Sequence, residues 1–121
     1  MEEYTRRFRP LLIFSPCDDG LELEKQRAEL NSSIDGLRER DLVLIEVVGD
    51  RVNTFLGPAC DSDAASLRAQ HRIAPDRFAA VLVGKDSGIK LKSETPISTP
   101  DLFSLIDAMP MRRQEMLRQK D

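Results

Sequence analysis

Cys17 is the residue of this chain whose type and position most directly suggest chemistry. It follows the apolar run 10–14, and Gly20 stands three residues later, where a Cys-x-x-Cys motif carries its second sulfur. One thiol cannot complete an internal dithiol–disulfide cycle. A thiolate beside a helix N-terminus is favoured by the helix dipole, whereas the neighbouring carboxylates of Asp18 and Asp19 disfavour it. Three interpretations of Cys17 stay open: a packed small residue, a reactive thiol, or half of a disulfide.

Cys60 is the other cysteine of the chain. Cys17 and Cys60 each follow one strand of an expected parallel pair, so both should lie at the same edge of the sheet. A disulfide between them requires Cα atoms within about 7 Å of each other. In the alternative interpretation, Cys17 is the reactive thiol of a peroxidase or disulfide reductase, and Cys60 is its resolving partner.

The remaining candidates for chemistry have simpler structural interpretations. His71, the single histidine, falls near the end of an expected helix, where a cationic side chain interacts favourably with the helix dipole. With no second histidine and no Cys-x-x-Cys, a zinc site is not expected. We predict no metal and no cofactor. We expect a cluster of acidic residues to cap a helix and face solvent rather than bind a metal: Asp18, Asp19, Glu22 and Glu24.

A run of methionine and arginine after a proline suggests a different kind of site. Met111, Arg112 and Arg113 follow Pro110, which should end the last well-defined helix. Methionines at a helix end usually pack against the core, but beside arginine they can also form an edge to which a partner docks. We predict an interaction surface that combines this run with the Cys17 loop, including Asp18 and Asp19, and with the segment 49–60.

Continuous apolar runs and capping residues predict the elements that position these residues. The 121-residue chain is 40% hydrophobic and 32% charged, which is typical of one globular domain. We expect a thioredoxin-like α/β domain over 9–116, with helices on both faces of a central mixed sheet of four main strands. The segments 1–8 and 117–121 would be polar extensions. The order would be β-α-β-α-β-β-α, with an extra hairpin near 49–56 left open. The expected strands are 9–15, 42–48, 78–83 and 89–92, and the expected helices are 21–34, 64–71 and one that begins at 98–101.

Charge and hydropathy argue against some classes of partner. The net charge of −3 gives no overall attraction to nucleic acid, and the basic chain ends carry few aromatic residues that could stack on bases. No apolar run approaches the ~20 residues that cross a bilayer. We predict a soluble domain with a protein partner, no nucleic acid and no membrane insertion, and a homo-oligomer stays open. Without a leader the chain would be cytoplasmic; if a leader has been removed, it would be periplasmic or secreted.

Four phrases carry a resemblance to a known family: 9–16 (RPLLIFSP), 39–43 (ERDLV), 83–91 (VGKDSGIKL) and 105–113 (LIDAMPMRR). Together they resemble a peroxiredoxin-like domain of unknown function. This domain occurs in bacterial proteins and in vertebrate sushi-repeat and matrix-associated secreted proteins. The resemblance covers about 9–116. It implies a thioredoxin-like fold without an established activity, and it assigns no functional residue.

The chain departs from the enzymes of this fold at three places. Gly20 replaces the second cysteine of thioredoxins. Arg77 and Phe78 stand where thioredoxins have a cis-proline before the third strand, and Phe14 stands where peroxidases have a threonine three residues before the reactive cysteine. We therefore predict a non-catalytic interaction domain, with a one-thiol redox enzyme as the alternative.

Overall fold

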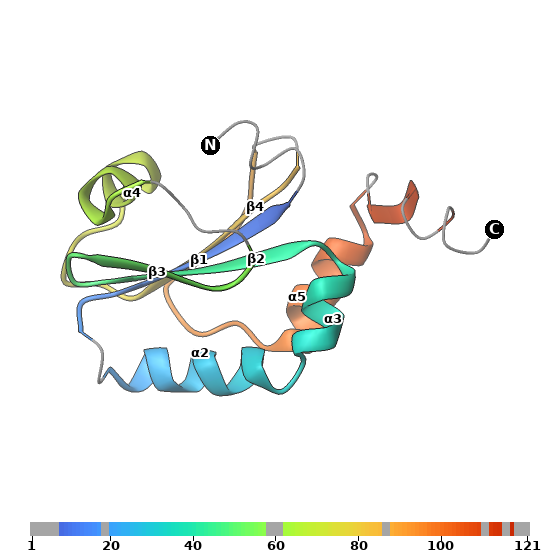
Figure 1. Cartoon of the computed structure of the whole chain (residues 1–121), viewed down its shortest axis with the longest axis horizontal. Helices are drawn as coiled ribbons and strands as arrows, with labels where there is room; N and C mark the ends of the chain where they lie inside the picture. Colours follow the sequence, from blue (N-terminus) through green and yellow to red (C-terminus); the bar gives the residue numbers. More distant parts are fainter. Residues whose placement is uncertain are drawn as a thin grey trace.

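Five strands form one mixed sheet in the computed structural model, which describes residues 8–17, 20–57, 62–85, 88–109, 112–114 and 117. Within these residues the strand order is β3-β2-β1-β4-β5 (Figure 1). The expected α/β class with a mixed sheet is confirmed. The strands are β1 (Arg9–Ser15), β2 (Leu42–Val48), β3 (Arg51–Leu56), β4 (Ala79–Val83) and β5 (Ile89–Ser93), and the helices are α2 (Leu21–Asn31), α3 (Ile34–Glu39), α4 (Ala64–His71) and α5 (Thr99–Asp107).

The central strand β1 is parallel to β2 and antiparallel to β4. β1 and β2 pair from Arg9 opposite Leu42 to Ser15 opposite Val48. β5 pairs antiparallel with β4, and β3 returns antiparallel along β2. The sheet therefore has five strands where four main strands were expected, because the segment after the turn at 49–50 pairs with β2. A two-residue turn containing glycine is well suited to joining two strands in this way.

The single helix predicted over 21–34 is wrong. The structure has two helices here, α2 and α3, separated by Ser32 and Ser33. The hydroxyl of Ser32 donates a 2.7 Å hydrogen bond to the carbonyl of Glu29. Serine side chains compete for backbone groups in this way and weaken the interior of a helix. The break allows α3 to pack as a separate helix, with Leu37 fully buried.

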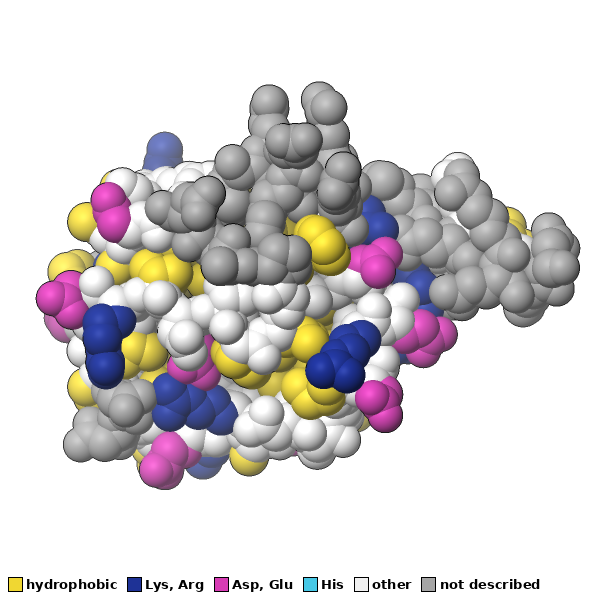
Figure 2. Space-filling view, in the orientation of Figure 1, with side chains coloured by type: hydrophobic (Ala, Val, Ile, Leu, Met, Phe, Trp, Pro, Cys, Tyr) yellow, Lys and Arg dark blue, Asp and Glu magenta, His cyan; other side chains and the backbone are white. Residues whose placement is uncertain are grey.

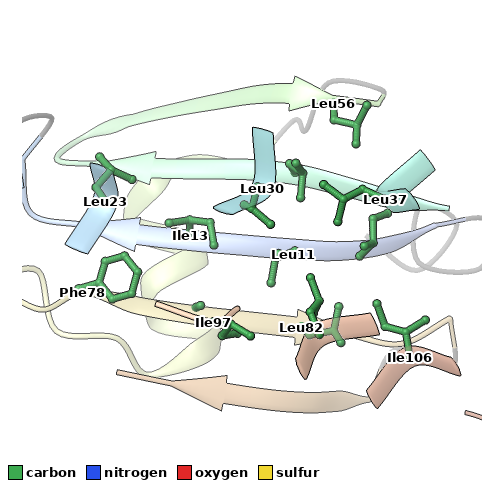
Figure 3. Close-up of a cluster of buried hydrophobic side chains, with 14 of the residues drawn as sticks. Leu11, Ile13, Leu23, Leu30, Leu37, Leu56, Phe78, Leu82, Ile97 and Ile106 are labelled. Carbon is green, nitrogen blue, oxygen red and sulfur yellow. The ribbon is translucent and has the colours of Figure 1, made fainter. Parts of the chain in front are cut away.

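Helices cover both faces of the sheet, as the continuous apolar strands predicted. α2, α3 and α5 lie on one face and α4 lies on the other (Figure 1). On the first face, leucines of α2 and α3 pack over β1 and its neighbours (Figure 3). These buried residues include Leu11, Ile13, Leu23, Leu30 and Leu37. The second face has its own apolar cluster, which includes Leu12, Phe14, Ile45, Leu67 and Val81.

Gln26 of α2 fixes the segment that leads into α5. Its side chain is buried and exchanges two hydrogen bonds with the main chain of Ile97, 2.9 Å from Nε2 to the carbonyl and 2.7 Å from the amide to Oε1. The carboxylate of Glu29 accepts hydrogen bonds from both the amide and the hydroxyl of Thr99. These contacts satisfy polar groups that would be costly to bury unpaired. They therefore hold the start of α5 against α2.

Candidate functional site

The carboxyl ends of β1 and β2 meet at what we call the Cys17 edge, formed by Cys17, Gly49, Asp50 and Arg68. The amide of Gly49 donates a 3.0 Å hydrogen bond to the carbonyl of Ser15, and Cys17, two residues further along, is exposed. Gly49 has a φ of 58°, a left-handed conformation that suits glycine in the tight turn between β2 and β3. Ligands of open α/β sheets bind outside the carboxyl ends of parallel strands, so this edge is the candidate site.

Gly20 occupies the place of a second sulfur in space as well as in sequence. It is the N-cap of α2, with a φ of −67° that any residue can adopt. A Cβ atom at this position would lie 3.8 Å from Sγ of Cys17 and 3.4 Å from Oγ of Ser15. These are ordinary contact distances, so the structure accommodates a Cβ at this position, next to the sulfur of Cys17.

Ser15 fixes the start of the Cys17 loop. Its side chain is buried, and its hydroxyl donates a 2.7 Å hydrogen bond to the carbonyl of Cys17. Asp18, Asp19 and Cys60 lie outside the described residues. The predicted docking role of the two aspartates and the predicted Cys17–Cys60 pairing therefore stay predictions.

Arg68 of α4 reaches across to the Cys17 edge, a role that was not predicted from the sequence. Its Nη1 donates to the carbonyl of Gly49, and its Nη2 lies 3.2 Å from the carbonyl of Ser15 and 3.5 Å from that of Val47. Its Nε is buried and has no hydrogen-bond partner among the described residues. The guanidinium thus joins the ends of β1 and β2 and holds the loops that follow them. An arginine on a short, modestly apolar helix gave no signal of this role.

A surface cavity of about 520 Å³ adjoins the Cys17 edge. Asp50 and Arg68 line it together with Asp63, the N-cap of α4, and with the apolar residues Ile73 and Pro75. The amide of Ser66 donates to the carboxylate of Asp63 and thereby lowers the pKa of this group. The cavity therefore combines an apolar wall with two carboxylates and one guanidinium.

A half-buried ion pair lies on the opposite face of the sheet, between α2 and β2. Glu46 is buried in β2, and Arg27 of α2 forms two hydrogen bonds of 2.8 and 2.7 Å with its carboxylate. The pair lines a cavity of about 510 Å³ together with Arg51 and Asn53 of β3. The signal in the sequence was the single charged residue within an otherwise apolar strand. Because each charge is matched, the pair can anchor α2 to the sheet without an external ion.

Arg112 and Arg113 of the predicted docking run lie at the other end of the sheet, at what we call the C-terminal corner (Glu39, Arg40, Asp107 and Arg112). Arg112 is buried there, donating to Asp107 over 3.3 Å and to the carbonyl and carboxylate of Glu39 over 3.2 and 3.3 Å. Arg40 forms hydrogen bonds of 3.0 and 2.9 Å with Asp107, which lower the pKa of this carboxyl. Arg113 is exposed.

The predicted interaction surface is therefore not continuous among the described residues. The structure places Cys17 at the same end of the sheet as Gly49 and Asp50, but it places Arg112 and Arg113 beyond the opposite ends of β1 and β2. Met111 lies outside the described residues. Burial leaves the side chain of Arg112 little surface for a partner, and Arg113 is the neighbour that can reach one.

His71 lies at the end of α4 as predicted, but the expected charge–dipole interaction does not hold. The side chain is buried, and neither ring nitrogen has a hydrogen-bond partner among the described residues. Its ring packs against Phe14, with centroids 6.0 Å apart. Burial lowers the pKa of His71, and the charge of Lys92 lowers it further. The imidazole is therefore held in its neutral form.

The described ranges show neither a metal cluster nor a membrane span. No three His, Cys, Asp or Glu side chains within them converge in a way that could hold a metal ion. No helix within them is both long and apolar enough to cross a bilayer. On the face drawn in Figure 2, basic and acidic side chains are interspersed with hydrophobic ones.

The fold and the site together define an α/β protein with a five-stranded mixed sheet and an exposed cysteine beyond its central parallel strand. The chain belongs to the family described as "Domain of unknown function (DUF4174)", whose model matches residues 1–115.

Curated relatives are much longer proteins. The chain is 28% identical to the sushi repeat-containing protein SRPX of Rattus norvegicus over an alignment of 127 residues. This alignment covers 100% of this chain and 27% of that protein. The identity and coverage are the same for SRPX of Homo sapiens. The chain is also 28% identical to coiled-coil domain-containing protein 80 of Danio rerio over an alignment of 141 residues. This alignment covers 99% of this chain and 16% of that protein. The chain thus spans about a quarter or less of these relatives.

Proposed function

We propose that this chain is a thioredoxin-like domain that binds a protein partner through the Cys17 edge and performs no turnover of its own. The topology supports the thioredoxin-like assignment. When β3 and the short α3 are set aside, the order β-α-β-α-β-β-α remains, with β1 and β2 parallel and β4 and β5 as a hairpin. The observation that carries the proposal is Gly20, which stands across from Sγ of Cys17 where a dithiol enzyme needs its second sulfur.

The Cys17 edge has the properties of a docking surface. Cys17 is exposed on a loop, and Arg68 ties this loop and the turn at 49–50 to the ends of buried strands. Binding residues are often found on loops that a rigid scaffold holds in this way. The adjacent cavity of about 520 Å³ offers an apolar wall to a partner side chain. Its rim of both charge signs suits a polar peptide better than a lipid.

We place the domain outside the cytoplasm. This rests on its resemblance to domains of secreted, matrix-associated proteins. In an oxidising compartment a Cys17–Cys60 disulfide would be stable and would tie the segment after β3 to the start of α2. Mass spectrometry without reductant tests this pairing on the purified chain.

Site-specific photo-cross-linking tests the docking role. A photoreactive residue in place of Asp50, at the Cys17 edge, should give a discrete cross-linked protein in an extract of the source organism. A photoreactive residue in place of Arg38, an exposed side chain of α3 at the far end, is the matched control. Excess unlabelled chain should abolish the product, and excess Arg68→Met should not. Equal cross-linking from both positions, or equal competition by both chains, would contradict the proposal.

A one-thiol redox enzyme is the second candidate, and the exposure of Cys17 beside the start of α2 favours it. A peroxide would oxidise the thiolate to a sulfenic acid and leave as an alcohol. Condensation with the thiol of Cys60 would then release water and form a disulfide, which an external thiol must reduce. Peroxide consumption with a thiol reductant, by the wild type and by Cys17→Ser, decides between the two candidates. We expect equal background rates.

A further inference from the structure

A basic cavity of about 370 Å³ is lined by residues of the α4–β4 connector (residues 72–78) and of β5. Arg72, Arg77 and Lys92 line it, and Glu94 is the one carboxylate among its described lining residues. Ile73 lines both this cavity and the cavity of the Cys17 edge, so the two are adjacent. The chain as a whole carries a net charge of −3, and a cavity with three cations and one anion is an exception to that balance.

Within the part of the chain that the structure describes, the cations of this cavity form no ion pairs. Elsewhere Arg27, Arg40 and Arg112 each contact a carboxylate. Among the described residues, by contrast, no carboxylate lies within ion-pair distance of Arg72 or Arg77.

Lys92 is also without a carboxylate partner there. Its Nζ donates a 2.9 Å hydrogen bond to the carbonyl of His71, which fixes the head group but does not cancel its charge. The cavity therefore presents three positive groups whose charge is available to a ligand.

Arg72 occupies a position where the backbone would accept glycine more readily. Its φ is 57° and its ψ is 47°, the left-handed conformation that commonly follows a helix and that favours glycine. The hydrogen bonds that end α4 come from backbone amides, from Ile73 to Arg68 over 2.9 Å and from Arg72 to Ala69 over 3.3 Å. None of them needs an arginine side chain. The backbone conformation and these hydrogen bonds therefore do not account for the guanidinium of Arg72.

The position of the cavity relates it to the Cys17 edge. Ala79, the first residue of β4, pairs with Phe14 near the carboxyl end of β1. The connector that precedes Ala79 therefore lies at the same end of the sheet as Cys17. A peptide chain bound across this end can place side chains in both cavities.

We propose that the basic cavity binds the acidic side chains of an extended segment of the protein partner, adjacent to the Cys17 edge. This rests on the proposed function, because it names the chemistry of the partner at the same end of the sheet. Carboxylates match the guanidinium groups of Arg72 and Arg77 in geometry as well as charge. Single-stranded nucleic acid would instead require exposed aromatic side chains for stacking, and Phe78, the aromatic residue of this cavity, is buried.

Fluorescence anisotropy with a labelled peptide tests this proposal on the full chain. The probe is an octapeptide rich in glutamate and aspartate, and a glutamine–asparagine version of it is the peptide control. The acidic peptide should bind, and its affinity should fall as NaCl rises from about 20 to about 200 mM, because salt screens exposed charges. The double variant Arg72→Gly/Arg77→Gln should bind about tenfold more weakly, as expected for two partly exposed charge contacts.

A charge-matched variant separates this cavity from general attraction. Arg38→Gln/Arg113→Gln removes two exposed cations at the opposite end of the sheet, on α3 and beside the C-terminal corner, and should bind like the wild type. Arg72→Gly relieves the left-handed strain, so thermal unfolding should show that the cavity variant stays folded. Equal weakening by both double variants, wild-type affinity in the cavity variant, or binding of free citrate without the peptide would each overturn the proposal.

The outcome is distinguishable from that of the proposed function. If position 50 cross-links a partner but the acidic peptide does not bind, the proposal of an acidic segment is wrong and the proposal of docking at the Cys17 edge stands. If the acidic peptide binds but position 50 cross-links no partner, the basic cavity stands as a peptide site and the proposal of docking at the Cys17 edge is wrong.

Discussion

The two ends of the sheet use their charged side chains in opposite ways. At the C-terminal corner, Arg40 and Arg112 each contact carboxylates of neighbouring elements, so their charges hold the chain together. At the other end, Arg68 contacts main-chain carbonyls, and Arg72 and Arg77 have no carboxylate partner among the described residues. Charge at the first end is used within the fold, whereas at the second end Arg68 holds the loops and, among the described residues, Arg72 and Arg77 form no ion pair.

Removing Arg112 is expected to have the largest effect on stability. The change Arg112→Ala removes the hydrogen bonds to Glu39 and leaves Asp107 with Arg40 alone, and it opens a space where a large buried side chain was. We expect the free energy of unfolding to fall by about 2–3 kcal/mol, since a fully buried side chain is lost together with its hydrogen bonds. Urea unfolding measures this. The exposed neighbour Arg113→Ala is the control and should change it by less than about 0.5 kcal/mol; equal effects would contradict the structural role of the corner.

Replacing Arg68 tests the Cys17 edge with a smaller effect. Arg68→Met keeps much of the side-chain volume but removes the donors to the carbonyls of Gly49 and Ser15. We expect a loss of about 1–2 kcal/mol, as for a few hydrogen bonds to a charged group. Amide exchange at 47–50 should accelerate, whereas exchange in α5 should follow only the global change. Gln70→Met, an exposed change on the same helix, should do neither; unchanged exchange in Arg68→Met would remove Arg68 as a positioning residue.

Mild acid should destabilise the end of the sheet that contains His71 before it affects the C-terminal corner. This is the smallest of the expected effects on stability. Burial lowers the pKa of His71 below the ordinary value of 6.5, so the unfolded chain binds more protons once the pH falls through 6.5. The contribution of His71 is complete above that pH and decreases below it. The pKa of Asp107 is lowered by Arg40, so its contribution is complete above 3.8 and is lost only as the pH falls below that value.

Amide exchange measured as the pH falls from 7 toward 5 should therefore show weaker protection in α4 and unchanged protection in α5. His71→Phe should flatten the response of α4, because no group that titrates near neutrality remains there. A wild-type response that begins in α5, or that persists in His71→Phe, would contradict this assignment.

Elements that local chemistry specifies could be predicted from the sequence. The bounds of β1, β2 and α4 agree with those predicted from continuous apolar runs and capping residues, and at α4 the cap is Asp63, whose side chain accepts from the amide of Ser66. Ser98 likewise begins α5, where its hydroxyl accepts from the amide of Asp101. Each of these signals lies within a few residues of the structure that it determines.

Features that depend on distant residues could not be predicted in this way. The helix over 21–34 ends early because a serine side chain competes for a local carbonyl, and β3 forms because β2 offers it a partner. Arg68 acts on carbonyls 19 and 53 residues away in the chain, and Arg112 is buried by Glu39, 73 residues away. Hydrophobic periodicity carries no information on such contacts. We therefore expected charged residues to face solvent or to bind a partner, whereas in the structure some of them stabilise the fold.

Restoring the second sulfur tests the central claim most directly, namely that the Cys17 edge docks a partner because it lacks a dithiol. Wild type, Gly20→Cys and the control Gly20→Ser are compared in the reduction of insulin disulfides, with bond mapping by mass spectrometry. We predict no turnover above the uncatalysed rate for wild type and Gly20→Ser. In Gly20→Cys we predict that the introduced thiol competes with Cys60 and forms a disulfide with Cys17, because its Cβ would lie 3.8 Å from Sγ of Cys17. Steady reduction by the wild type that disappears in Cys17→Ser would contradict the account.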